Sequence, residues 1–385
     1  MKEGWTYKKL GEVAQSELGK TLNSAKDKGS SYPYLCAINV LWDKIDTTTL
    51  KETKFEESEL ERYSVKKGDL LICEGGDIGR AAIWDKDQPI LYQNALHRLR
   101  FHDALLPRFC LLYLRCLKEK GILDGRYGKG VTIKHLVKSS LLSIPIPVPP
   151  LSEQQHIVSE LDLLSSIIEK KKAQLKEYDQ LAQSIFYDMF GDPVTNEKGW
   201  EVKMLGEVGT IITGSTPSTK DDINYSSKDY CFIKPSDISN DNISLISDSE
   251  FYISKSAYEK SRKLPKGSVL VTCIGIVGKI GILFKEATCN QQINAIKPNV
   301  FTTPFYLAYS LVSLKKILES IAHAPVVPII NKRQFSNIVI PLPPLSLQQS
   351  FASKIEAIER QKALIQQSIS ETETLFNSRM DYYFD

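Results

Sequence analysis

The sequence predicts an α+β protein in which two tandem mixed α/β domains are separated by two long antiparallel coiled-coil helices, in a duplicated chain with pseudo-twofold symmetry. Three observations predict this fold: motifs recur in the same order 194 to 199 residues apart, a long heptad pattern ends each copy, and strand-like runs mixed with turns precede it. We expect globular domains over residues 1–150 and 193–344, a central helix over 151–192 and a C-terminal helix over 345–385.

The composition indicates a folded protein with more than one core. A chain of 385 residues exceeds what one hydrophobic core usually organises, and 42% hydrophobic with 25% charged residues is ordinary for a globular protein. The N-terminus has no apolar signal segment, and the longest apolar stretch, residues 269–284, includes Lys279 and is too short to cross a bilayer. Seven scattered cysteines, never spaced Cys-x-x-Cys, suit free buried thiols. We therefore expect a cytoplasmic protein that has no contact with a membrane.

The internal repeat consists of three blocks that occur twice. They are a Trp-x-x-x-x-Leu-Gly-Glu-Val start, a Lys-Gly block that leads into a glycine loop, and a Pro-Pro-Leu-Ser-x-Gln-Gln segment. The first copies are residues 4–13, 67–80 and 147–155, and the second copies are residues 199–208, 266–279 and 341–349. The conserved order indicates a tandem duplication whose loops have diverged.

Each copy ends in a pattern typical of a long helix. Prolines over residues 144–150 disfavour a helix or a central strand, so this stretch should be extended. Ser152 with Gln155, and Ser346 with Gln349, have the spacing of a capping box, which predicts the start of each helix. Apolar residues then recur in steps of four and three, as in a heptad seam. The seam residues are Ile157, Leu161, Leu164, Ile168, Lys171, Leu175 and Tyr178 in the first helix, and Phe351, Ile355, Ile358, Lys362, Ile365 and Ile369 in the second.

Helices of this length need a partner. At 1.5 Å per residue each spans roughly 55–60 Å, more than a small domain, and a narrow seam suits pairing with another helix. Since the chain supplies two such helices, we expect them to pair with each other in antiparallel orientation. Lys171 and Lys362 then lie in the seam, where they either fix the register or extend their charged ends to solvent.

The charges are unevenly distributed. Segment 152–190 has four basic and seven acidic residues, and segment 346–385 has four and six, whereas the whole chain carries +3. The rest of the chain therefore carries +8. This division favours globular parts that meet a polyanion and helices that do not.

The globular parts mix strand-like and helix-like segments. Short β-branched and aromatic runs bounded by turns predict strands, and longer apolar-periodic stretches predict helices. The predicted strands lie near residues 34–38, 69–72, 231–233 and 269–271, and the predicted helices near 105–118 and 305–318.

Polar and basic residues of these parts are candidates for contacts with nucleic acid. Glycine loops over 75–80 and 275–279 let a backbone approach a phosphate and each ends in a cation, while residues 213–220 form a hydroxyl-rich loop. Amides at 93–94 and 290–294 are of the kind that binds adenine bidentately in a major groove. Plain turns, and amides that cap them, are the alternatives. The candidates are Arg80, Gln93, Asn94, Arg98, Lys129, Lys134, Ser218, Lys220, Lys234, Lys279, Gln291, Gln292 and Asn294.

The sequence shows no recognisable catalytic constellation. The Pro-Pro pairs at 149–150 and 343–344 have apolar neighbours, whereas a DNA aminomethylase needs an acid or amide before the pair and an aromatic residue after it. No Pro-Asp dipeptide begins a nuclease motif, no Walker loop is present, and five isolated histidines have no metal-binding spacing. We therefore expect neither a catalytic residue nor a metal or cofactor site in this chain.

Taken in order, these motifs resemble those of type I restriction-modification specificity subunits over essentially the whole chain. The resemblance rests on the Trp-x-x-x-x-Leu-Gly-Glu-Val starts, Thr-Gly-Ser-Thr-Pro-Ser at 213–218, the glycine loops, Asn290-Gln291-Gln292, and the Pro-Pro-Leu-Ser-x-Gln-Gln starts of the long helices. The first half departs from the pattern, with Glu17-Leu18-Gly19-Lys20 in place of Gly-Ser-Thr-Pro-Ser. That departure concerns which individual residues of the first half contact the ligand, and does not affect the resemblance to the family.

The resemblance implies a non-catalytic subunit whose two target-recognition domains each read one half of a bipartite double-stranded DNA target. It also implies two modification subunits, which bring S-adenosylmethionine and adenine methylation, and restriction subunits, which bring ATP-driven translocation and Mg²⁺-dependent cleavage. Two other hypotheses are a stand-alone duplicated scaffold that binds proteins without reading DNA, and an enzyme with an unrecognised site.

Overall fold

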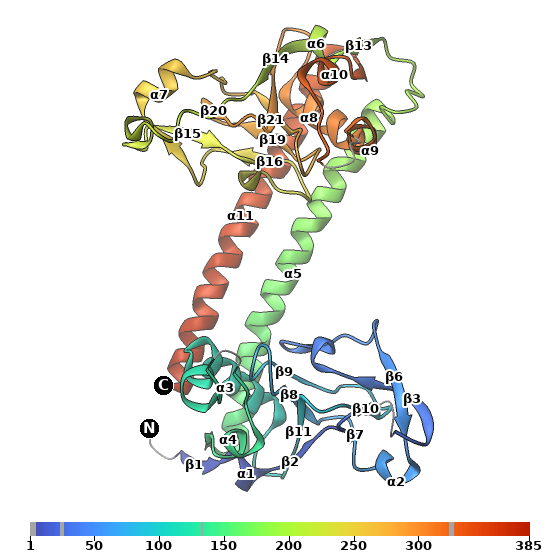
Figure 1. Cartoon of the computed structure of the whole chain (residues 1–385), viewed down its shortest axis with the longest axis vertical. Coiled ribbons are helices and arrows are strands. Elements are labelled where there is room, and N and C mark those ends of the chain that lie inside the picture. Colours follow the sequence, from blue (N-terminus) through green and yellow to red (C-terminus); the bar gives the residue numbers. More distant parts are fainter. Residues whose placement is uncertain (1–4, 24–26, 132–133, 323–326) are drawn as a thin grey trace. The chain divides into compact units, whose positions relative to one another are not determined.

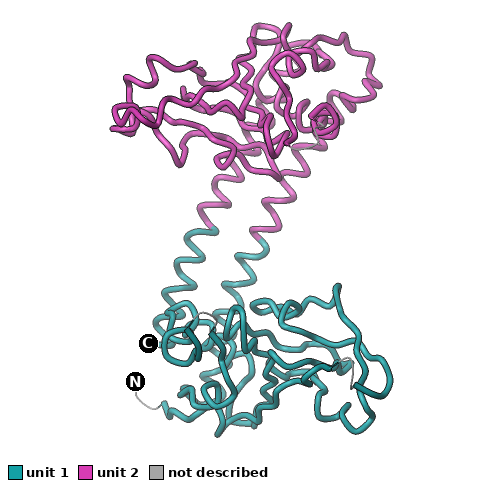
Figure 2. Tube along the Cα trace, in the orientation of Figure 1, with its two compact units in different colours: residues 1–170, 369–385 teal, residues 171–368 magenta. Residues whose placement is uncertain are grey.

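The computed structural model divides into two compact units (Figure 2). Unit 1 comprises residues 1–170 and 369–385, and unit 2 comprises residues 171–368. Two helices of 40 residues each, α5 (Leu151–Phe190) and α11 (Leu345–Phe384), contribute residues to both units. The residues that the structure describes are 5–23, 27–131, 134–322 and 327–385.

Unit 1 is built on short strands (Figure 1). Its strands are β1 (Thr6–Lys9), β2 (Ala14–Leu18), β3 (Ser30–Leu35), β4 (Val40–Leu41), β5 (Lys44–Ile45), β6 (Lys51–Phe55), β7 (Ser64–Val65), β8 (Leu70–Cys73), β9 (Ala81–Ile83), β10 (Ile90–Tyr92), β11 (Leu96–Phe101) and β12 (Pro145–Val148). Its helices are α1 (Leu10–Val13), η1 (Ala37–Asn39), α2 (Glu57–Leu60), α3 (Pro107–Glu119), η2 (Leu123–Tyr127) and α4 (Lys138–Leu142), with parts of α5 and α11. The sheets have the orders β2-β11-β8-β9, β6-β3-β10-β7, β1-β12 and β4-β5.

Unit 2 has a similar set of elements (Figure 1). Its strands are β13 (Val202–Met204), β14 (Gly209–Thr213), β15 (Tyr230–Ile233), β16 (Ser244–Ile246), β17 (Tyr252–Ile253), β18 (Val269–Thr272), β19 (Ile280–Leu283), β20 (Ala287–Cys289), β21 (Ile293–Pro298) and β22 (Val339–Pro341). Its helices are α6 (Leu205–Val208), η3 (Asp222–Tyr225), η4 (Pro235–Asp237), α7 (Lys255–Lys260), α8 (Pro304–Ser313), α9 (Lys315–Ile321) and α10 (Lys332–Ser336), with the remaining parts of α5 and α11. The sheets have the orders β14-β21-β18-β19-β16, β17-β15-β20 and β13-β22.

The two units repeat one topology. The order β2-β11-β8-β9 corresponds to β14-β21-β18-β19, the order β6-β3-β10 corresponds to β17-β15-β20, and β1-β12 corresponds to β13-β22. The pair β3–β10 and its counterpart β15–β20 are both parallel. The duplication and the mixed α/β character predicted from the sequence are therefore confirmed.

The predicted segments fit these elements closely. The stretch 105–118 is α3, and 305–318 is divided between α8 and α9. The proline-rich stretch forms β12, which pairs with β1 along one edge, so its missing N–H groups disturb no central strand. The strand predicted over 34–38 ends at Leu35 and is followed by the short helix η1.

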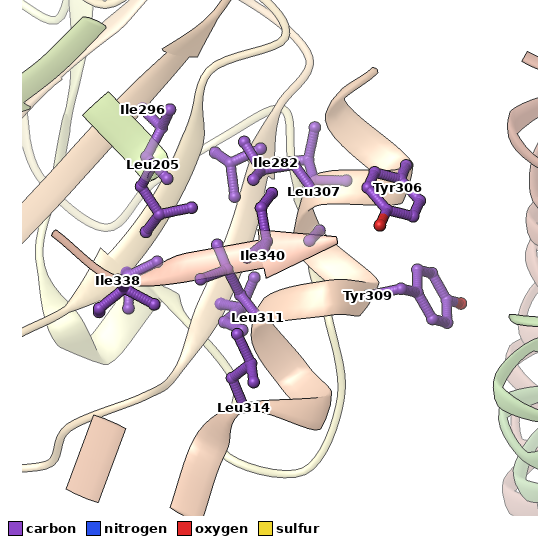
Figure 3. Packing of buried hydrophobic residues seen from close by; sticks show 14 of the residues in the cluster. Leu205, Ile282, Ile296, Tyr306, Leu307, Tyr309, Leu311, Leu314, Ile338 and Ile340 are labelled. Atoms are coloured by element: carbon purple, nitrogen blue, oxygen red, sulfur yellow. The ribbon is translucent and has the colours of Figure 1, made fainter. Parts of the chain in front are cut away.

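The largest core of unit 2 lies between its five-stranded sheet, α8 and the two long helices. Leu307 and Leu311 of α8 and Ile340 of β22 all belong to this cluster (Figure 3). Phe186 of α5 and Phe351 of α11 are both fully buried in this cluster, with ring centroids 5.6 Å apart. Burying an aromatic side chain contributes about 1.5–3 kcal/mol. The long helices are therefore part of the core of the domain, and not only a linker.

The predicted capping boxes are wrong. The helices begin at Leu151 and Leu345, so Ser152 and Ser346 already lie in their first turns and cannot be N-caps. The first turns are held instead by Gln154 and Gln348, whose fully buried side chains donate to the carbonyls that precede each helix.

The two long helices pair in antiparallel orientation within each unit. In unit 1, Arg379 Nη2 donates to Glu160 Oε2 at 2.9 Å. In unit 2, Lys362 Nζ donates to Asp179 Oδ1 at 2.7 Å. Increasing residue numbers in α5 therefore face decreasing numbers in α11, as predicted for an antiparallel pair.

The seam residues are buried to different degrees. Leu175, Tyr178 and Ile365 are half-buried. Lys171 donates to Ser368 Oγ, and the Lys362 side chain is 17% exposed, so both lysines reach polar partners inside the helix pair. The most buried residues, each at most 9% exposed, are Ile157, Leu161, Leu164, Ile168, Phe351, Ile355, Ile358 and Ile369.

All seven cysteines are buried free thiols, as predicted. Burial raises the pKa of Cys273 to about 11 and that of Cys289 to about 12, which keeps both in the unreactive thiol form. Among the described residues, no helix combines the length and apolar character that a membrane span requires.

Candidate nucleic-acid interface

In both units a glycine that follows one of the equivalent strands β2 and β14 passes very close to another segment of the chain, an arrangement that we call the glycine crossing. Gly19 follows β2 and donates its N–H to Leu96 at 3.1 Å, and Gly214 follows β14 and donates to Ile293 at 3.0 Å. A Cβ on Gly19 would lie 2.1 Å from the Gln93 carbonyl oxygen, and one on Gly214 would lie 2.0 Å from the Asn290 carbonyl oxygen. Only glycine allows these chain segments to pass so closely.

The crossing brings a threonine and an amide together in each unit. In unit 1, Asn94 Nδ2 donates to Thr21 Oγ1 at 3.3 Å. In unit 2, Thr216 Oγ1 donates to Gln291 Oε1 at 2.5 Å. Both hydrogen bonds lie at the surface, where Thr21, Thr216 and Gln291 are exposed and Asn94 is half-buried. The predicted amides Asn94 and Gln291 thus occupy equivalent surface positions. Thr21, the partner of Asn94, was not among the predicted residues.

The neighbouring amides are placed differently. Asn290 Nδ2 donates to Gln292 Oε1 at 2.9 Å, and Gln292 is half-buried. Asn294 is only 2% exposed, and its side chain is hydrogen-bonded to Thr213 Oγ1 and to the Ile330 carbonyl. Asn294 therefore lies inside the protein, while Gln93 lies half-buried at the crossing in unit 1.

The cations that end the two glycine loops have matching partners. Arg80 Nη2 donates to the Ala37 carbonyl of η1 at 2.8 Å, and Lys279 Nζ donates to the Pro235 carbonyl of η4 at 3.0 Å. Because η1 and η4 follow the equivalent strands β3 and β15, Arg80 and Lys279 each donate a hydrogen bond to the equivalent short helix of their own unit. In this arrangement both charges are directed at the protein's own backbone.

The other predicted cations fall into two groups. Arg98 is 5% exposed and donates to the carbonyls of Arg62 and Ser64, and Lys134 Nζ donates to the Asp124 carbonyl at 2.6 Å. Lys234 is half-buried, with its Nζ over the Phe251 ring. Lys129 and Lys220, in contrast, are exposed.

The hydroxyl-rich loop of unit 2 lies beside α7. Ser218 is exposed, accepts from the Lys220 N–H at 3.3 Å, and lines a cavity of about 250 Å³ together with Lys260. Lys260 was missed by the sequence reasoning because it is 42 residues from Ser218. An alignment of the two copies around Val65 and Leu264 would have drawn attention to Lys260, because the segment before Leu264 is basic and the segment before Val65 is acidic.

No group of three or more His, Cys, Asp or Glu side chains in the described chain is arranged to hold a metal ion. His97 is fully buried with Nε2 2.8 Å from the Leu136 carbonyl oxygen, and burial lowers its pKa. A neutral histidine in such a position is part of the core.

Comparison with known proteins gives a match to a family profile. Residues 2–177 and 197–374 each match the type I restriction modification DNA specificity domain. The chain belongs to this family. Its two domains coincide with the two halves of the sequence repeat.

The relatives of this chain include named type I specificity subunits. It is 24% identical to the type I restriction enzyme MjaIX specificity subunit of Methanocaldococcus jannaschii over 92% of this chain and 86% of that protein. It is 25% identical to the EcoBI specificity subunit of Escherichia coli over 77% of this chain and 68% of that protein. The crystal structure of the type I restriction-modification S subunit from M. genitalium has the same fold, with a TM-score of 0.60 and 15% identity over 98% of this chain and 95% of that one.

The resemblance inferred from the motifs is therefore confirmed. This chain is a type I restriction-modification specificity subunit with two tandem DNA specificity domains.

Proposed function

We propose that this specificity subunit reads a bipartite DNA target, with one half-site contacted by unit 1 and the other by unit 2. The observation that carries this proposal is the repetition of the glycine crossing with its threonine–amide pair at the surface, Thr21 with Asn94 and Thr216 with Gln291. Two equivalent polar surfaces on one chain suit two separate half-sites. The target-recognition domains then correspond to residues 1–150 and 193–344.

The amides at the crossings are the base-reading candidates that the structure supports best. Asparagine and glutamine bind an adenine edge bidentately in the major groove, and each such pair discriminates by about 1–3 kcal/mol. Asn94 and Gln291 are anchored through one side-chain atom, while the other remains to face a base. Gln93 and Gln292 lie next to them along the chain and are proposed as further contacts.

The exposed cations and hydroxyls are proposed as phosphate contacts. Lys129 in unit 1 and Lys220 with Ser218 in unit 2 can position the duplex without reading sequence. Lys134 in unit 1 and Lys234 in unit 2 are proposed for the same role, although their ammonium groups already have partners in the protein. A different role is proposed for Arg80, Arg98, Lys279 and Asn294, whose bonds inside the units shape the surfaces that contact DNA.

The chemistry is proposed to come from other subunits. Two modification subunits would bring S-adenosylmethionine for adenine methylation, and restriction subunits would bring ATP and Mg²⁺, in a complex that works in the cytoplasm. The chain itself would supply no catalytic group. The paired helices α5 and α11 are proposed to set the distance between the two half-sites and to present a surface for subunit assembly.

The test is to co-express the chain with its modification subunits and to map methylated adenines genome-wide by single-molecule sequencing. A split motif with a fixed spacer is expected. In the same assay, Asn94→Ala should relax one half-site and Gln291→Ala the other, whereas Lys332→Gln, an exposed change on α10, should alter neither. A stable complex without any methylated motif would favour the duplicated protein scaffold, the main alternative.

A further inference from the structure

Two short segments occupy the same place in the two units but carry opposite charge. Residues 56–64 follow β6 and precede Val65, which pairs with Ile90 of β10. Residues 255–263 follow β17 and precede Leu264, which pairs with Ala287 of β20. Since β6 and β17 pair with the equivalent strands β3 and β15, the two segments are structural counterparts.

The charge difference between these counterparts is large. Residues 56–64 contain four glutamates and one arginine, a net charge of −3, whereas residues 255–263 contain three lysines, one arginine and one glutamate, a net charge of +3. At the same position in a duplicated fold, the acidic segment of unit 1 repels a polyanion and the basic segment of unit 2 attracts it.

In unit 1 an ion-pair cluster lies beside this segment. Lys20, which follows the glycine crossing, is 5% exposed and extends to Glu59 of α2 at 2.6 Å and to Asp27 at 3.5 Å. Its Nζ also donates to the Lys54 carbonyl at 2.9 Å. Although burial lowers the pKa of Lys20, Glu59 and Asp27 outweigh it and raise the pKa above its ordinary value. The cation after the crossing is therefore neutralised within the protein.

In unit 2 an open cavity lies beside the equivalent segment. Ser215 stands after the crossing where unit 1 has Lys20, and the cavity is lined by Ser215, Thr216, Ser218, Lys260 and Ser261 among others. We call it the α7 cleft. Asp221 also lines it, but its carboxylate accepts from the Ile223 N–H at 3.3 Å and so caps η3.

Hydrogen bonds hold both sides of the α7 cleft in place next to the glycine crossing. Arg262 Nη1 donates to the Thr213 carbonyl at 2.7 Å, and Tyr225 Oη donates to the Pro217 carbonyl at 2.9 Å. The hydroxyl loop and the basic segment are thus held in fixed positions on either side of the cavity, within reach of the amide pair at Gln291. Hydroxyl donors next to an ammonium group are the usual contacts of a DNA phosphate.

We propose that the α7 cleft binds a backbone phosphate of the half-site read by unit 2, and that the counterpart segment 56–64 of unit 1 forms no equivalent clamp with the described residues around it. This inference rests on the proposed reading of DNA by the two units. It makes the specificity subunit electrostatically asymmetric, because the second half-site gains a phosphate contact that has no counterpart in segment 56–64 of unit 1. Lys260 positions the duplex and carries no sequence information.

The test uses the full complex with its modification subunits and two fluorescent duplexes, one with the methylated motif and one with a scrambled sequence. Anisotropy titrations between about 50 and 200 mM salt give the dependence of affinity on salt. Lys260→Gln is expected to lower the salt slope by about one and to weaken binding to both duplexes by the same factor, roughly three- to tenfold. The matched control Lys332→Gln removes the same charge from unit 2 outside the cleft and should retain the wild-type slope.

Neutral methylphosphonates placed in either half-site complete the test. Replacement in the half-site read by unit 2 should weaken wild-type binding more than it weakens binding by Lys260→Gln, because Lys220 and Ser218 remain as phosphate contacts in both. Equal slopes for Lys260→Gln and the control would overturn the clamp and leave the DNA-reading proposal intact. Loss of subunit assembly in Lys260→Gln, without a change in the salt slope of assembled complexes, would assign the cleft to a protein partner and overturn it as well. A wild-type complex that does not distinguish the two duplexes would instead overturn the reading function itself.

Discussion

The buried side-chain oxygen of Gln154 accepts a hydrogen bond from the backbone N–H of Leu106 at 2.8 Å. In unit 2, Gln348 accepts from the N–H of Thr303 at 3.0 Å in the same way. Each glutamine also donates to two carbonyls, one before the long helix and one before α3 or α8. Gln154 therefore holds the start of α5 against the start of α3, and Gln348 holds the start of α11 against the start of α8.

Gln154→Ala and Gln348→Ala are each expected to lower the free energy of unfolding by about 1–3 kcal/mol, because a buried N–H and two carbonyls lose their partner. Chemical denaturation of the purified chain measures this. The neighbouring Gln155→Ala is the control, since Gln155 is exposed and its loss should change stability by less than about 0.5 kcal/mol. If Gln154→Ala and Gln155→Ala lower the free energy of unfolding by the same amount, the hydrogen bonds of Gln154 do not stabilise the start of the helix.

These glutamines show which features of the fold can be predicted from the sequence and which cannot. The heptads and the repeat predicted both long helices, since these signals are local and periodic. The sequence suggested Ser152 as the cap, but the partner that matters to Gln154 is Leu106, 48 residues earlier in the chain. The same limit applies to the candidate site, because only the fold reveals that Arg80 faces the Ala37 carbonyl and that Asn294 is buried. The equivalence of Gly19 with Gly214, and of Asn94 with Gln291, also comes from the fold, because these residues lie outside the three repeated blocks.

Gly19→Ala and Gly214→Ala are expected to damage one recognition surface each. The added Cβ would meet a backbone carbonyl oxygen about 2 Å away, so the crossing must open and displace the threonine–amide pair. A loss of about 1–3 kcal/mol or more in stability should accompany loss of methylation of the motif. Gly125→Ala is the control, since nothing lies within 4 Å of the position its Cβ would take. Wild-type methylation by both crossing variants would show that the close approach is not needed.

The ion pair of Glu160 and Arg379 predicts a pH dependence of unit 1. The hydrogen bonds that Arg379 and then Tyr383 donate to Glu160 outweigh its burial and hold the pKa of this carboxyl below its ordinary value of 4.5. Its contribution to stability is thus present above pH 4.5 and is lost as the pH falls through the lower value of the folded state. Glu160→Gln should be slightly less stable than wild type at pH 7, and the difference should vanish in acid. The effect is small because both side chains are about a third exposed. Denaturation curves at several pH values, with the exposed Glu169→Gln as control, measure it.

Lys362 holds two carboxylates together in the helix seam of unit 2. Its Nζ lies 2.7 Å from Asp179 and 2.8 Å from Glu359, and although burial lowers its pKa, these carboxylates raise it above 10.5. Its stabilising effect is therefore fully present below pH 10.5 and is lost as the pH rises through the folded-state pKa. Lys362→Met should cost about 1–2 kcal/mol at pH 7, because the carboxylates are left facing each other. Adding Asp179→Asn should restore part of this loss. If the double variant is no more stable than Lys362→Met, the carboxylates do not interact through the lysine.

The proposed spacing role of the long helices predicts how an insertion changes the DNA target. Lys171 of α5 and Ser368 of α11 face each other, so seven residues added next to each would lengthen both helices and preserve the heptad phase of the seam. Seven helical residues add about 10 Å, or roughly three base pairs at 3.4 Å each. The methylated motif should then keep both half-sites and gain a longer spacer. The same insertion in α5 alone puts the seam out of register and should abolish methylation. An unchanged spacer in the double insertion, or altered half-sites, would show that the helices do not set the distance.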